Sequence, residues 1–140
     1  MDNLKLGDKT RAVADRMEHL HLGVADANRS IDFYRRAFGF EVRHDGVGLY
    51  GRCAHVGTDR FYLALSENPG LLRGGRSDAA SFYHMGFTTP DLAGFRARLA
   101  EERIEVIEEA ERAEGDAVYL NDPDGHQIEV VAYKPDYVYA

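Results

Sequence analysis

The chain has 140 residues, 44% of them hydrophobic, and a formal net charge of −7. This length suits one ordinary domain with its own apolar core. No stretch reaches the roughly 18 to 20 consecutive apolar residues of a membrane helix, and the polar start is unlike a secretory signal. The chain also lacks a basic run that could follow a nucleic-acid backbone. We therefore expect a single cytoplasmic domain that binds neither membrane nor nucleic acid.

The first predicted elements are a strand, a helix and three further strands. After an N-terminal extension of residues 1–16, the strand HLHLGVA begins at His19, and Asp26 is suited to cap the helix that follows. Ile31, Tyr34 and Phe38 have helical spacing, and Gly39 ends the helix. Three strand-like segments follow in FEVR, LYGRCAHVG and RFYLALS. Residues 17–66 therefore form a βαβββ module.

The same order returns after a linker of residues 67–81, which is rich in glycine and polar residues. The strand HMGFTT precedes Asp91, and a helix follows in which Leu92, Phe95 and Leu99 have helical spacing. The segments IEVI, AVYL and HQIEVVAY complete a second βαβββ module over residues 82–133. One domain over residues 17–133 thus contains two modules.

A constant offset of 65 residues relates the two modules and predicts one structural unit used twice. The matched pairs are His19 with His84, Asp26 with Asp91, Val42 with Ile107, Asp59 with Asp124, Leu63 with Ile128, and Leu65 with Val130.

Glu129 stands in a β-branched run, where one face should be buried and a carboxylate needs a partner. Alternation along a strand places Glu129 and Gln127 on one face. The polar faces of the first and fifth strands carry three imidazoles, those of His19, His21 and His84. Imidazoles and a carboxylate that meet in a half-buried cavity make a metal-binding set, because each donates a lone pair.

These stretches resemble the vicinal oxygen chelate superfamily: glyoxalase I, extradiol dioxygenases, fosfomycin resistance proteins and bleomycin-binding proteins. The resemblance rests on HLHLGVADANRSIDFYRRAFGF, YHMGFTTPDLAGF and VYLNDPDGHQIEV and covers residues 18–133. It implies an α+β fold in which two βαβββ modules form an open U-shaped mixed β-barrel, with helices outside and a divalent metal inside. It also implies a homodimer, with the site either within one chain or shared between two.

The resemblance assigns the site residues by position. The family's first ligand stands seven residues before the aspartate that opens each helix, which selects His19 and His84, and Glu129 is the third ligand. Tyr119, ten residues before Glu129, matches a tyrosine of extradiol dioxygenases and fosfomycin-type transferases. His21 is the second candidate catalytic residue, as a base, a substrate contact or a competing ligand. The candidate substrate-binding positions are Tyr62, Ala64 and Gln127.

The resemblance implies a metal-dependent enzyme whose small oxygenated substrate chelates the metal. The ligand set is closest to the extradiol-dioxygenase type, because the fourth ligand of glyoxalase I falls on Ala64. Dioxygenases carry an acid/base histidine where Tyr62 stands, so a glyoxalase-like lyase is the alternative. The ligands suit Fe(II), Mn, Zn, Ni or Co.

Two further alternatives stay open. A fosfomycin-type thiol transferase fits Tyr119, and AEGDAVYL resembles the monovalent-cation loop of these enzymes, but only Lys134 stands near the C-terminus to meet a phosphonate. A metal-free, ligand-sequestering dimer of the bleomycin resistance type would not need the three ligands. The repeat places none of the remaining histidines in the cavity, so we interpret them as surface or turn residues: His44, His55 and His126.

Overall fold

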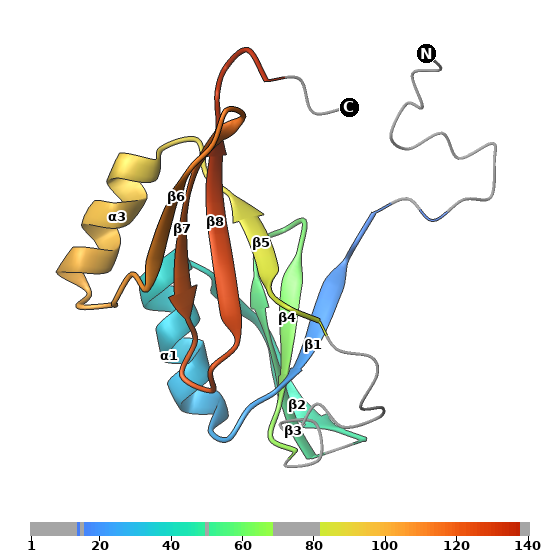
Figure 1. The fold of residues 1–140 in the computed structure, drawn as a ribbon. Helices are drawn as coiled ribbons and strands as arrows, with labels where there is room; N and C mark the ends of the chain where they lie inside the picture. Colours follow the sequence, from blue (N-terminus) through green and yellow to red (C-terminus); the bar gives the residue numbers. More distant parts are fainter. Residues whose placement is uncertain (1–13, 15, 50, 69–81, 138–140) are drawn as a thin grey trace.

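The computed structural model describes residues 14, 16–49, 51–68 and 82–137, and the chain follows the order βαβββ twice (Figure 1). The first module contains β1 (His19–Gly23), α1 (Ala27–Phe38), β2 (Glu41–Gly48), β3 (Gly51–Gly57) and β4 (Tyr62–Ser66). The second contains β5 (Met85–Thr88), α3 (Leu92–Glu101), β6 (Glu108–Glu111), β7 (Gly115–Asn121) and β8 (Gln127–Tyr133). Most of the predicted N-terminal extension, 1–16, and of the linker, 67–81, lies outside the described residues.

Both helices begin where the sequence predicts, because an aspartate caps each one. The Asp26 side chain accepts a hydrogen bond from the Arg29 N–H at 3.2 Å, and the Asp91 side chain accepts one from the Gly94 N–H at 2.9 Å. Gly39 ends α1 with a φ of 69°, a left-handed conformation that favours glycine. The predicted starts of both helices and the predicted end of α1 are confirmed. No described helix is long and apolar enough to span a membrane.

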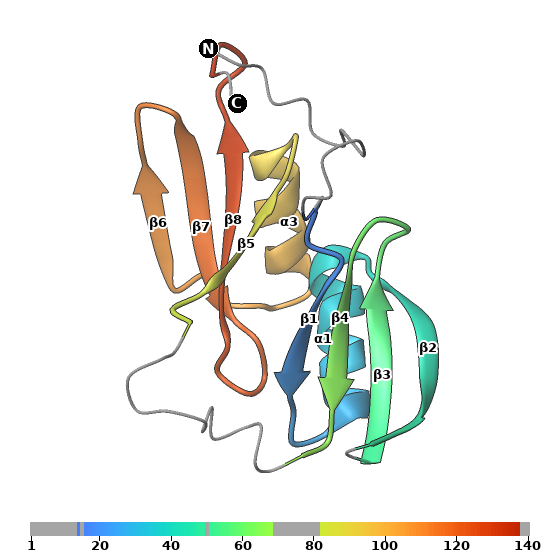
Figure 2. The same ribbon diagram turned by 90° about the vertical axis from the view of Figure 1, so that its right-hand side faces the viewer.

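Each module forms its own four-stranded mixed sheet. The strand orders are β1-β4-β3-β2 and β5-β8-β7-β6, with a parallel pair at β1–β4 and at β5–β8. The two sheets do not close into a barrel, and Figure 2 shows both helices behind them. The predicted α+β fold of two βαβββ modules in an open arrangement is confirmed.

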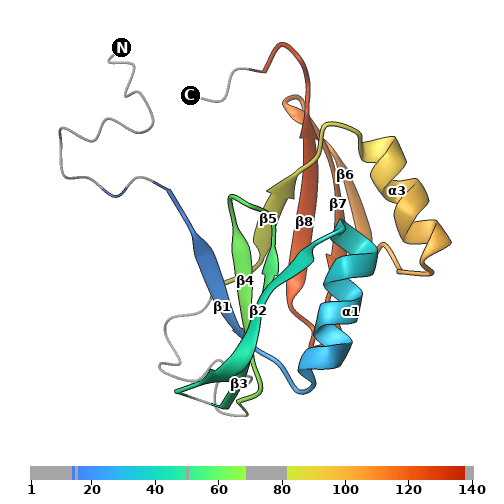
Figure 3. The same ribbon diagram turned by 180° about the vertical axis from the view of Figure 1, so that it is seen from behind.

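The two modules share one apolar core on the helix side of their sheets. This core contains Leu22, Leu63 and Leu65 from the first sheet, Val118, Ile128 and Val130 from the second, and Tyr34 and Leu99 from the helices. Burying each large side chain contributes about 1.5 to 3 kcal/mol to folding. The helices leave the opposite faces of both sheets uncovered (Figure 3). Those faces carry His19 and Glu129, because their strand neighbours Leu20 and Ile128 pack in the core.

The 65-residue repeat is visible in the strand pairing. His21 pairs with Ala64 across β1 and β4, just as Gly86 pairs with Glu129 across β5 and β8. Ala64 is therefore the structural equivalent of Glu129. The turn between β7 and β8 is one residue longer than the turn between β3 and β4, so the offset differs by one residue at the third strand of each module.

The strand predicted at IEVI, residues 104–107, is displaced by four residues. The structure places β6 at Glu108–Glu111, and its glutamates are exposed. Ile104 and Val106 instead pack against the core within the connection that follows α3. Ile104 and Val106 thus mark core contacts, and hydrogen bonding to β7 begins at Ile107, whose N–H donates to the Tyr119 carbonyl at 2.8 Å.

Candidate functional site

His84 and Glu129 meet on the uncovered face of the second sheet. Glu129 lies on β8 and His84 directly precedes β5, with His84 Nε2 2.9 Å from Glu129 Oε2. Burial alone would raise the pKa of Glu129, but hydrogen bonds and charges from Arg112 and His84 hold it below its usual value. The carboxylate is therefore ionised at neutral pH, and an imidazole nitrogen and a carboxylate oxygen face one another.

Arg112 holds the second oxygen of Glu129. Arg112 Nη1 donates to Glu129 Oε1 at 2.7 Å, and Nη2 donates to the Tyr119 hydroxyl. Tyr119 is directly opposite Glu129 across β7 and β8. We call His84, Arg112, Tyr119 and Glu129 the Glu129 half-site. Sequence reasoning missed Arg112 because it follows β6 in a hairpin turn and belongs to no motif.

His19 lies on the other sheet, in β1. Its ring stacks on Tyr62, with centroids 4.8 Å apart and planes 9° from parallel. His19 Nδ1 is 3.1 Å from Glu18 Oε1, and a carboxylate only accepts, so Nδ1 is the donor, and in the neutral imidazole the lone pair is then on Nε2. A carboxylate at the second nitrogen is the usual partner of a metal-binding histidine. We call Glu18, His19 and Tyr62 the His19 half-site.

The three predicted ligands belong to two separate half-sites within one chain. In Figure 2, β1 runs down the page while β5 and β8 run up, so the starts of β1 and β5 lie at opposite ends of the view. His19 is the first residue of β1, and His84 directly precedes β5. The ligand atoms of His19, His84 and Glu129 do not all lie within 4.8 Å of one another. Among the described residues, ligand atoms this close together belong to Asp122, Asp124 and His126.

The other predicted site residues lie on the same two faces. His21 Nε2 is 2.6 Å from Ser66 Oγ. Ala64, 4% exposed, pairs with His21 on one side and His55 on the other. Gln127 is half-buried on β8, two residues before Glu129.

His55 lies on the site face of the first sheet, so its interpretation as a surface or turn residue is wrong. Its ring stacks on Tyr62 with centroids 4.4 Å apart, and His44 follows at 5.2 Å. Burial and the neighbouring cationic groups lower the pKa of His55, which favours a neutral imidazole at pH 7. Strand alternation could have found this residue, because its neighbours Ala54 and Val56 are buried.

His126 is not a simple turn residue either, because it forms a buried clamp between the β7–β8 turn and α1. His126 Nδ1 is 2.6 Å from Asp122 Oδ2, and the Tyr34 hydroxyl donates to the same oxygen at 2.7 Å. Asp122 Oδ1 accepts from the backbone N–H groups of Asp124 and His126. The Asp124 carboxylate accepts from side chains of α1, those of Arg29 and Ser30. The group has the donor types that bind a metal: Asp122, Asp124 and His126. The carboxylate oxygens already accept hydrogen bonds from protein groups, which favours a structural clamp.

We expect His126→Gln to lower the free energy of unfolding by about 1 to 3 kcal/mol, because it removes an ionic partner from the buried Asp122. The hydrogen bond to Asp122 raises the pKa of His126 in spite of burial. This stabilisation is therefore complete below the unfolded pKa of about 6.5 and is lost as pH rises through the higher folded pKa. Urea unfolding should show a smaller difference in the free energy of unfolding between wild type and variant at pH 9 than at pH 6.

The exposed His44 provides the control for this prediction. His44→Gln should change the free energy of unfolding by less than about 0.5 kcal/mol at both pH values. A His126→Gln effect that does not vary with pH would show that the ion pair is not its source.

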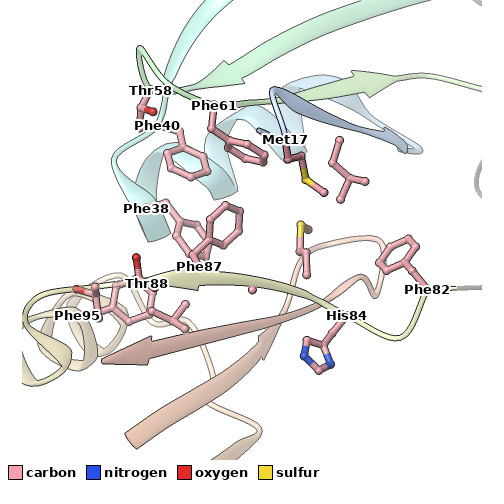
Figure 4. Close-up of a pocket in the computed structure, with 15 residues that line it drawn as sticks. Met17, Phe38, Phe40, Thr58, Phe61, Phe82, His84, Phe87, Thr88 and Phe95 are labelled. Atoms are coloured by element: carbon pink, nitrogen blue, oxygen red, sulfur yellow. The ribbon is translucent and has the colours of Figure 1, made fainter. Parts of the chain in front are cut away.

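A cavity of about 690 Å³ lies between residues of β1 and β5 on the core side. Figure 4 shows its phenylalanine side chains, and it shows the His84 imidazole pointing away from them. The labelled aromatic residues are Phe38, Phe40, Phe61, Phe82, Phe87 and Phe95. The cavity is therefore on the opposite side of β5 from the His84 imidazole.

Comparison with known proteins gives relatives of nearly the whole chain. A family model described as Glyoxalase/Bleomycin resistance protein/Dioxygenase superfamily matches residues 16–130. Catechol-2,3-dioxygenase of Bacillus subtilis is 34% identical over 84% of this chain and 43% of that protein, so the chain spans less than half of its length. Metallothiol transferase FosB of Bacillus licheniformis is 28% identical over 81% of this chain and 73% of that protein. Lactoylglutathione lyase of Pseudomonas aeruginosa is 24% identical over 81% of this chain and 80% of that protein.

Solved structures share the fold. TnmS3, an antibiotic binding protein from Streptomyces, has a TM-score of 0.70 and 23% identity over 88% of this chain and 98% of that chain. The fosfomycin resistance protein FosX of Listeria monocytogenes has a TM-score of 0.68 and 20% identity over 89% of this chain and 98% of that chain.

Proposed function

Since this chain belongs to the Glyoxalase/Bleomycin resistance protein/Dioxygenase superfamily, we propose that it is a divalent-metal enzyme whose small oxygenated substrate chelates the metal. The supporting observation is the 2.9 Å separation of His84 Nε2 and Glu129 Oε2. Two ligand atoms about 2.1 Å from one ion and at right angles are about 3.0 Å apart, so the pair has this spacing, and a metal ion would replace the proton that Nε2 donates to the carboxylate here. His19, with Glu18 at Nδ1, supplies the third ligand.

The donor set of two imidazoles and one carboxylate suits Fe(II), Mn, Zn, Ni or Co. Such an ion, when bound, acts as a Lewis acid towards an oxygen anion of the substrate. Tyr119 is the residue placed to hydrogen-bond a substrate oxygen, because its hydroxyl lies beside Glu129 and is held by Arg112. His21 and His55 on the first sheet are the candidates for proton transfer.

We favour chemistry of the extradiol-dioxygenase type. Three protein ligands leave three positions of an octahedral shell, enough for a bidentate substrate together with a small co-substrate. The 34% identity to catechol-2,3-dioxygenase supports this choice. Glyoxalase-like isomerisation is the alternative, although Ala64 provides no fourth ligand. A thiol transferase is a further alternative, for which Arg112 supplies a cation beside Glu129.

We also propose that the metal site is completed between two copies of the chain. The His19 and Glu129 half-sites lie on different sheets whose helix sides share one core. A two-fold partner brings the His19 half-site of one copy to the Glu129 half-site of the other, and the same operation completes the second site. The exposed ring of Tyr83, whose centroid lies 5.0 Å from that of His84, would gain cover in such a dimer.

Metal reconstitution with and without air, followed by a panel of catechols and hemithioacetals, tests the proposed function. We expect stoichiometric metal and turnover of a catechol only in air. Hemithioacetal turnover without air would instead favour the glyoxalase-like alternative. Purified, reconstituted protein without stoichiometric metal would contradict the proposal and favour a ligand-sequestering protein.

Ala64→Glu tests whether three ligands set the chemistry. Ala64 occupies on the first sheet the position that Glu129 has on the second. An added carboxylate should tighten the metal dissociation constant roughly tenfold, which is about 1.4 kcal/mol. Catechol turnover should collapse because one open position is lost, whereas a hemithioacetal activity should survive or appear.

Ala64→Gln is the matched control, since it adds a side chain of similar size without the charge. Ala64 is 4% exposed, so equal unfolding midpoints must first show that both variants tolerate the added volume. Unchanged affinity in folded Ala64→Glu would mean that this position does not face the metal.

A further inference from the structure

The β6–β7 hairpin fixes the backbone of Arg112. The Arg112 N–H donates to the Gly115 carbonyl at 3.1 Å, and the Arg112 carbonyl accepts from the Gly115 N–H at 3.3 Å. Gly115 also packs closely against β8, because a Cβ at this position would lie 2.3 Å from the Ala132 carbonyl oxygen. The start of the Arg112 side chain therefore has a defined position at the end of the second sheet.

The guanidinium of Arg112 joins two directly paired residues. Tyr119 and Glu129 face each other across β7 and β8, and Arg112 donates to both from the two ends of one planar group. A rigid fork of this kind fixes the orientation of its partners as well as their charge. Glu129 is 15% exposed at its side chain, so solvent competes little for these contacts.

The contacts divide the two oxygens of Glu129 between different partners. Oε1 accepts from Arg112 at 2.7 Å, whereas Oε2 lies 2.9 Å from His84 Nε2. Only Oε2 is therefore available beside the imidazole nitrogen that would share the metal.

We propose that Arg112 is a positioning residue that restricts Glu129 to one metal-facing oxygen and holds the Tyr119 hydroxyl next to it. This inference rests on the proposed function. A carboxylate that offers both oxygens fills one more position of the metal shell. Arg112 thus preserves the open positions that a chelating substrate needs.

A purely electrostatic role for Arg112 predicts the opposite effect on metal affinity. If the guanidinium only competed with the metal for the Glu129 charge, its removal would tighten metal binding. Loss of an orienting partner weakens metal binding by about 10-fold to 100-fold. The direction of the change therefore separates the two roles.

The test uses full-length Arg112→Met and Arg112→Lys. Methionine removes the charge and the donors, whereas lysine keeps the charge but replaces the fork with a single ammonium group. Arg35→Met is the control, because Arg35 pairs with Asp32 at 3.0 Å on the surface of α1 and carries the same charge. Zinc titration gives the dissociation constant, and infrared difference spectra with and without zinc give the splitting of the carboxylate stretches.

We expect both Arg112 variants to bind zinc about 10-fold to 100-fold more weakly than wild type. The infrared splitting should narrow as Glu129 changes from one-oxygen to two-oxygen coordination. Arg35→Met should match wild type in both measurements. Equal or tighter zinc binding by Arg112→Met, or an unchanged infrared splitting in Arg112→Lys, would overturn the inference while leaving the metal site intact. Wild type that takes up no zinc or other divalent metal would overturn the proposed function itself.

Discussion

Replacing Glu129 with alanine should weaken divalent-metal binding by at least about 100-fold, which corresponds to about 2.7 kcal/mol. The substitution removes the only anionic ligand of the proposed set and leaves His84 without its partner at 2.9 Å. The domain should stay folded, because Glu129 lies on the face opposite the shared core formed by Ile128 and Val130. Equilibrium metal titration, together with the urea unfolding midpoint, measures both expectations.

Glu105→Ala is the matched control, since Glu105 is exposed and precedes β6 outside the half-site. It carries the same charge change and should bind metal as wild type does. His84→Ala should resemble Glu129→Ala, because both ligands belong to the same half-site. Wild-type affinity in folded Glu129→Ala would remove this residue from the metal site and with it the central support for the proposed enzyme.

The fold was predictable largely because its local signals occur twice. Asp26 and Asp91 cap the helices at the same distance from His19 and His84, and the structure confirms both caps. The exception is β6, where Ile104 contributes to the core from a connecting segment. A pattern of apolar residues predicts which side chains are buried. A strand is defined by its backbone hydrogen bonds, and these are not visible in the sequence.

The site was predictable only in part. Alternation along β8 is sufficient to place Glu129 on a polar face, and the family resemblance, through the seven-residue spacing to Asp91, then selects His84 as a ligand. Arg112 could not be found in this way, because its long side chain crosses from a hairpin to residues 7 and 17 positions away. Similarly, the ion pair of His126 with Asp122 depends on how the turn folds back on itself.

The pattern of strands in the sequence does not distinguish a site within one chain from a site shared between two. Two similar modules can face each other inside a chain or across a two-fold axis, and their strand patterns are identical in both cases. The predicted linker between the modules, residues 67–81, lies mostly outside the described residues. The separation of His19 from Glu129 on different sheets is the structural reason for proposing the shared site.

A heterodimer of His19→Ala and Glu129→Ala chains should therefore recover about half of the wild-type metal content, although neither homodimer binds metal well. In a shared arrangement, one of its two sites combines an intact His19 with an intact Glu129 half-site, and the other site carries both substitutions. Chains with two different affinity tags, purified as the heterodimer, allow metal content and catechol turnover to be measured on a defined species.

The control heterodimer combines His84→Ala with Glu129→Ala. Both substitutions fall in the same half-site, so each of its two sites lacks one ligand and no recovery is expected. Recovery in both heterodimers would place the metal away from these residues. If each site were complete within one chain, neither heterodimer would contain an intact site. Failure of the His19→Ala and Glu129→Ala pair, with a stable dimer in sedimentation, would therefore reject the shared site. Recovery in that pair alone requires ligands from two chains, because no arrangement confined to one chain can combine an intact His19 with an intact Glu129 in these proteins.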